Sequence, residues 1–150
     1  MFNHHRLIDF IILILLLTPW DAESQVRHEI LIGRTTGILE LDEGQTIRVS
    51  GFTNTLSGQV SLPGITLDAV LGDSIVIDFW NISQGDPHDF TLKGIPTRKS
   101  SKWRHNSNDL SIYHMDHGYY HFTAEQTGTY LYYCPIKYPF NVQAGMFGLL

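Results

Sequence analysis

Short runs of β-branched and aromatic residues, separated by clusters of Gly, Asn, Asp and Pro, fill most of the sequence after residue 25. This alternation of strand-forming runs and turn residues is typical of strands joined by tight turns, and few stretches repeat with the period of a helix. The pattern predicts strands at residues 27–32, 37–41, 46–50, 65–70, 74–81, 88–92, 118–124, 129–134 and 145–149. Many short strands at this spacing favour an all-β fold, a sandwich or barrel with Greek-key connections. Residues 93–110 are polar and strand-poor, which predicts a long surface loop or a short helix.

The N-terminus carries an unbroken apolar run at residues 10–17. The run is too short to span a bilayer, since a transmembrane helix needs about 20 apolar residues. It fits a secretory signal peptide, and the small residues within 22–24 predict removal of residues 1–24. The alternative is a retained membrane anchor with Trp20 at the interface. We therefore expect a periplasmic or extracellular protein whose remaining chain, residues 25–150, is one domain.

Charge and cysteine usage exclude several classes of protein. The formal net charge is −5 and no basic patch is present, so a nucleic-acid partner is not expected. Cys134 is the only cysteine, which rules out an internal disulfide. An unpaired thiol in an oxidising compartment is more often buried or bound to a metal than exposed. No phosphate loop or nucleophile-elbow motif occurs.

Two segments carry the motif that points to a family. The first is LGDSIVIDFWNISQGDPHDFTL, residues 71–92, and the second is GTYLYYCPIKYPFNVQAGM, residues 128–146. Together with SLPG before the first segment, this combination resembles the cupredoxins, and in particular the cupredoxin domains of copper nitrite reductases and multicopper oxidases. The resemblance covers most of residues 58–150 and implies a cupredoxin-type β-sandwich.

The resemblance also implies a ligand set for one copper ion: His88 as the first histidine, Cys134 as the thiolate and Met146 as the axial ligand. A thiolate and imidazoles from distant segments, with a weak thioether, suit one-electron cycling of copper. The ring of His88 needs a second partner, and a backbone carbonyl or a neighbour such as Asn81 could supply it. The second histidine of the family lies five positions before the axial methionine, and here that position is Asn141.

Four alternatives follow from Asn141. In the first, copper is held by three protein ligands, with water, Asn141 or a partner's ligand in the fourth position. In the second, a histidine from the cluster His114, His117 and His121 completes the site, although alternation places His121 with Tyr119 and Thr123, opposite Tyr120 and Phe122. In the third, this cluster forms a metal site of its own. In the fourth, copper has been lost, and Cys134 is only a buried core residue.

The enzymatic activities of the family require residues that this sequence does not have. The cysteine is flanked by Tyr133 and Pro135 rather than by a histidine, and Phe90 stands where a His-x-His pair would need its second histidine. We therefore expect no oxidase or nitrite reductase activity. Two functions remain: an electron carrier with an altered type 1-like site, or a copper-free cupredoxin-like structural or partner-binding subunit of an exported or membrane-anchored complex.

Partner contacts are expected at two places. A redox protein or other complex subunits would dock near His88 and the apolar group Tyr138, Pro139 and Phe140. A membrane contact is expected only if the N-terminal segment is retained. The last predicted strand is short, so the sheet is either barely closed or completed by another chain, and an open edge would let a partner strand pair within an assembly.

Overall fold

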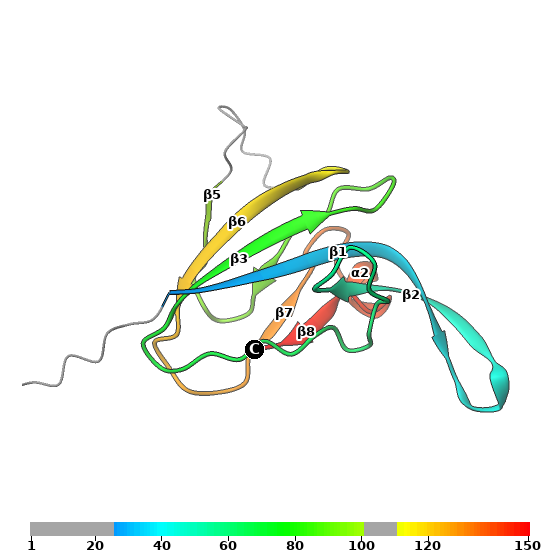
Figure 1. The fold of residues 1–150 in the computed structure, drawn as a ribbon, viewed down its shortest axis with the longest axis horizontal. Coiled ribbons are helices and arrows are strands. Elements are labelled where there is room, and N and C mark those ends of the chain that lie inside the picture. Colours follow the sequence, from blue (N-terminus) through cyan, green and yellow to red (C-terminus); the bar gives the residue numbers. More distant parts are fainter. Residues whose placement is uncertain (1–25, 101–110) are drawn as a thin grey trace, which may run out of the picture.

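The computed structural model describes residues 26–100 and 111–150, and the expected signal segment lies outside this part of the chain. Two sheets pack face to face (Figure 1). The larger has the order β2-β1-β3-β6-β5 and the smaller the order β4-β7-β8. The strands are β1 (Val26–Glu40), β2 (Thr46–Thr53), β3 (Ser74–Asn81), β4 (Thr91–Leu92), β5 (Arg98–Ser100), β6 (Asp116–Thr123), β7 (Leu131–Tyr133) and β8 (Phe147–Leu149), with a short 3-10 helix η1 (Asp42–Gly44) and the helix α2 (Phe140–Gln143).

The core lies between the two sheets. On β3, Ile75, Ile77 and Phe79 point inward because successive side chains of a strand alternate between its faces. The buried cluster comprises Phe52, Leu67, Ile75, Ile77, Phe79, Phe90, Leu92, Ile112, Tyr120, Phe122, Ala124, Tyr132, Cys134 and Met146. Both sheets contribute to it, and Phe52 contacts Tyr132 across them with ring centroids 5.4 Å apart. The predicted all-β sandwich is therefore confirmed.

Several strand predictions need correction. The predicted strands at 27–32 and 37–41 form one strand, β1, whose register with β2 shifts between Arg34 and Gly37. β3 matches its predicted range, whereas of residues 88–92 only 91–92 form a strand. The prediction for 65–70 is wrong, because these residues have no strand pairing of their own. The segment 93–110 contains β5, which pairs with β6, and residues 101–110 lie outside the described part.

The expected open edge at the last strand is partly covered. The backbone N–H groups of Gly64 and Leu67 donate to the carbonyl oxygens of Phe147 and Leu149, at 2.7 and 2.9 Å. These two hydrogen bonds lie along β8, which forms an antiparallel strand pair with β7. The irregular segment that contains Gly64 and Leu67 thus occupies part of the edge of β8 that an added partner strand would use.

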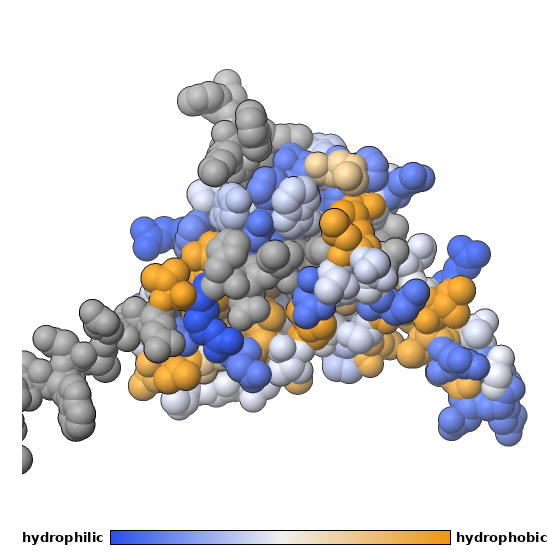
Figure 2. All heavy atoms as spheres, viewed as in Figure 1, coloured by the Kyte–Doolittle hydropathy of each residue, from blue (hydrophilic) through white to orange (hydrophobic). Residues whose placement is uncertain are grey.

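The β1–β2 hairpin projects beyond the sandwich (Figure 1). Its outer part carries the exposed apolar side chains Ile38, Leu41 and Ile47. Figure 2 shows apolar and hydrophilic residues side by side on this projection. The core therefore ends before the tip of the hairpin.

Candidate metal centre

His88 is positioned by the loop that follows β3. Its backbone N–H and carbonyl pair with those of Ile112, at 2.9 and 2.7 Å, which holds the residue against the sandwich. The side chain of Asn81, at the end of β3, donates to the carbonyl oxygens of Asp86 and Ile112 and accepts from Ser83. We expected Asn81 as a partner for the histidine ring, but it fixes the loop instead.

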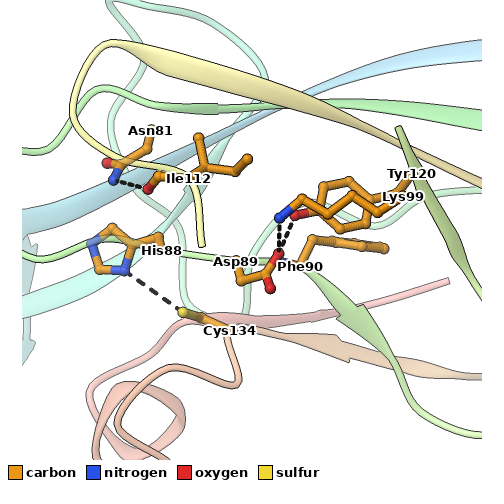
Figure 3. A network of polar contacts seen from close by, with 8 residues as sticks. All are labelled: Asn81, His88, Asp89, Phe90, Lys99, Ile112, Tyr120 and Cys134. Atoms are coloured by element: carbon orange, nitrogen blue, oxygen red, sulfur yellow. Dashed lines mark hydrogen bonds and ion pairs between the residues drawn. The ribbon is translucent and has the colours of Figure 1, made fainter. Parts of the chain in front are cut away.

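The imidazole of His88 is only 2% exposed and faces the cysteine (Figure 3). Its Nδ1 lies 3.6 Å from Sγ of Cys134. Its Nε2 is buried and has no hydrogen-bond partner among the described residues. Burial lowers the pKa of His88, so the ring is held as the neutral imidazole that a metal ligand must be.

Cys134, Asn141 and Met146 come together through the turn around α2. Cys134 follows β7, and its N–H donates to the carbonyl oxygen of Met146 at 3.1 Å. The N–H of Met146 in turn donates to the carbonyl oxygen of Asn141 at 2.9 Å. α2, which the sequence analysis did not predict, turns Asn141 inward while Phe140 stays exposed. The four residues of the predicted ligand set are therefore all buried at one end of the sandwich.

The sulfur of Cys134 accepts a hydrogen bond from the side chain of Asn141. Burial raises the pKa of the Cys134 thiol, and hydrogen bonds from the backbone of Asp89, the side chain of Asn141 and the backbone of Ile136 oppose that rise. The Asn141 contact joins Nδ2 to Sγ at 3.5 Å. These donors stabilise a thiolate, which is the form that binds metal.

The donor atoms fit one ion between His88 and Cys134. Metal bonds of about 2.0 Å to nitrogen and about 2.3 Å to sulfur at a tetrahedral angle place the two atoms about 3.5 Å apart. The observed separation is 3.6 Å. A buried thiolate and thioether are soft donors, and together with an imidazole they form a set suited to copper. Among the described residues no group of three or more His, Cys, Asp or Glu could hold a metal, so Met146 and Asn141 are the other candidates here.

A charged network that the sequence analysis missed adjoins the site (Figure 3). The buried carboxylate of Asp89, next to His88, accepts hydrogen bonds from the hydroxyl of Tyr120 and from Lys99, the latter at 3.2 Å. It also accepts the N–H of Phe90 at 2.8 Å. Burial is the main cause that raises the pKa of Tyr120, and the carboxylate adds to it. The only sequence signal was an acidic residue directly after the candidate ligand.

The histidine cluster does not form a common site in the described part of the chain. Nδ1 of His117 bonds to Asp78 at 2.8 Å, and the ring stacks on Trp80. Nδ1 of His114 lies 2.6 Å from the carbonyl oxygen of Ser83. His121 alternates with the buried Tyr120 and Phe122, as predicted, and contacts Ser100 across the strand pair.

The loop between Cys134 and Asn141 carries exposed side chains. Tyr138 is 68% exposed and Phe140 is 65% exposed, which agrees with the surface character expected of this group. Lys137 pairs with Asp86 at 2.5 Å and joins the loop after Cys134 to the loop before His88. The described residues include no helix long and apolar enough to cross a membrane.

Comparison with known proteins identifies the fold. No family model and no curated protein matches this sequence. Among solved structures, a multicopper oxidase from Pseudomonas thermotolerans is 20% identical with a TM-score of 0.67, and the match covers 85% of this chain and 29% of that one. A copper nitrite reductase from Nitrosomonas europaea is 19% identical with a TM-score of 0.65, covering 83% and 40%.

These neighbours show that the chain has the cupredoxin fold. A cupredoxin-like domain is therefore established, and the resemblance drawn from the sequence motifs is confirmed at the level of fold. The chain spans 29% and 40% of the lengths of the two neighbours, so it corresponds to one part of each. What those proteins catalyse does not transfer with the fold.

Proposed function

We propose that this chain is an exported one-electron carrier with a mononuclear, type 1-like copper site of altered composition. The observation that carries the proposal is the buried pair formed by Nδ1 of His88 and Sγ of Cys134, 3.6 Å apart. Met146 is buried beside them in the same core cluster. Bound copper would supply a centre that cycles between its one-electron oxidation states.

The protein's part is to hold the donors rigidly and to keep water away. His88 is fixed through both backbone groups, and the sulfur accepts a hydrogen bond from Nδ2 of Asn141. If His88 binds through Nδ1, its proton resides on Nε2. Because the ligands sit in a packed sandwich, they need little rearrangement when the charge of the site changes, and this favours fast electron transfer.

Electron carriage fits better than catalysis. No residue adjacent to Cys134 is a histidine, so the backbone link to a second copper centre that the enzymatic relatives need is not encoded. The exposed Tyr138 and Phe140 near the site offer an apolar contact for a transient redox partner. Exchange of Phe140 for Glu is expected to slow electron self-exchange of the copper-loaded protein. Val70→Glu should leave the rate unchanged, because this exposed residue precedes β3 whereas His88 follows the other end of that strand.

The direct test is the copper content and visible absorption of the purified protein titrated with copper, beside Cys134→Ala and His88→Gln variants. We expect one bound copper and a thiolate-to-copper charge-transfer band in the oxidised protein, both lost in the Cys134→Ala variant. Equal copper content in the protein and both variants would refute the site. Stoichiometric absence of copper would favour the second candidate, a copper-free cupredoxin-like binding subunit, which the hydrogen bond from Asn141 to the sulfur also allows.

A further inference from the structure

The side chain of Asn141 faces the cysteine sulfur with its nitrogen. Nδ2 lies 3.5 Å from Sγ, and the residue is held by α2 and by the bond from the N–H of Met146 to its carbonyl oxygen. An amide N–H donates to sulfur, whereas an amide oxygen in that place would oppose the lone pairs of the thiolate. Since an amide nitrogen has no lone pair to offer a metal, Asn141 acts on the sulfur and does not replace the imidazole as a ligand.

The sulfur accepts a hydrogen bond from Nδ2 of Asn141. The backbones of Asp89 and Ile136 also act to lower the pKa of the thiol, against the larger effect of burial. Hydrogen bonds around the cysteine sulfur of such sites tune the reduction potential. Each one draws electron density from the thiolate, which weakens its donation to Cu(II) more than to Cu(I).

Burial acts in the same direction. Cys134, Met146 and His88 are at most 2% exposed. With one thiolate as the only anionic ligand, Cu(I) gives a neutral site and Cu(II) gives a site with one positive charge. A buried net charge is unfavourable unless it is compensated. The nearby carboxylate of Asp89 offers little compensation, because Lys99 already pairs with it at 3.2 Å.

We infer that this centre selects Cu(I) over Cu(II), and that Asn141 is the positioning residue that sets the preference through its hydrogen bond to Cys134. The inference rests on the proposed function, since it requires that the site binds copper. Two soft sulfur ligands and one imidazole are a donor set that Cu(I) accepts readily. The carrier would then rest in its reduced form and act as a strong one-electron acceptor when oxidised.

The test measures the affinities for Cu(I) and Cu(II) by competition with chelators of known affinity, Cu(I) under anaerobic conditions, together with the reduction potential. The Asn141→Leu variant keeps the number and branching of the side-chain heavy atoms and loses the donor. This hydrogen bond is present in both oxidation states but is stronger to the Cu(I)-bound thiolate, which keeps more negative charge, so we expect the preference for Cu(I) to fall by up to about tenfold. Each tenfold change lowers the potential by about 59 mV. Gln143→Leu, on the exposed face of the same helix, should leave both quantities unchanged.

Asn141→His provides a second imidazole and should move the preference further toward Cu(II), with a stronger charge-transfer band. Circular dichroism establishes that each variant is folded, and Asn141→Leu suffices if the histidine variant does not fold. Equal affinities for the two oxidation states in the unmodified protein, or an unchanged ratio in Asn141→Leu, would overturn the inference while leaving the copper site intact. If neither Cu(I) nor Cu(II) binds, the proposed function is refuted instead.

Discussion

Two buried tyrosines allow the stability contributed by a hydrogen bond to a carboxylate to be compared with that of a hydrogen bond to a neutral carbonyl oxygen. The hydroxyl of Tyr120 donates to the buried carboxylate of Asp89, and the hydroxyl of Tyr132 donates to the carbonyl oxygen of Ile65 at 2.6 Å. Both rings lie in the core, and exchange for Phe preserves their packing. The two substitutions therefore differ mainly in the charge of the acceptor that loses its donor.

A hydrogen bond to a charged group contributes about 1.5–3 kcal/mol, and one between neutral groups about 0.5–1.5 kcal/mol. We expect Tyr120→Phe to lower the free energy of unfolding by about 2–3 kcal/mol and Tyr132→Phe by about 1 kcal/mol. Ile65 is half-buried, so water can replace the lost donor there. Lys99→Met should cost more, about 3–5 kcal/mol, because it removes the cation of a mostly buried pair.

The assay is urea unfolding of the copper-free protein under reducing conditions, with the free energies compared at equal slopes. A loss for Tyr132→Phe that equals or exceeds the loss for Tyr120→Phe would refute the reasoning, since it would mean that the carboxylate does not depend on its tyrosine donor. An unchanged stability for Lys99→Met would show that Asp89 is not paired in solution.

In the copper-free protein, burial lowers the pKa of His88 below its unfolded value. The free energy of unfolding should therefore be highest above about pH 6.5 and fall as the pH drops below that value. Urea unfolding across pH measures this profile, which should be flatter for the His88→Gln variant. Gly148→Ala should lower the melting temperature through a loss of about 1–3 kcal/mol, because the added Cβ would lie 2.2 Å from the ring of Tyr132; an unchanged temperature would contradict the packing. Lys137→Ala should leave the free energy of unfolding almost unchanged, because its pair with Asp86 is exposed; a clear loss would show that the pair holds the two loops together.

The strands that the sequence predicted best are those whose pattern is set by burial. β3 alternates between core and partly covered residues over its whole length, and its predicted bounds match. The segment 65–70 has similar composition, yet it lies along β8 with only scattered backbone bonds. Composition cannot separate these cases, because a strand exists only where a neighbour pairs with it in register.

The sequence by itself determined the class of fold and the candidate donors. Alternation and turn residues indicated packed sheets, and the resemblance of two motifs to the cupredoxins implied His88, Cys134 and Met146 as candidate donors. Only the tertiary structure decided how these residues face one another. It turned Asn141 toward the sulfur as a donor, and it brought Lys99 and Tyr120 to Asp89 from distant strands. Periodicity records which face of an element is buried, whereas hydrogen-bond partners depend on the distances between elements that are remote in the chain.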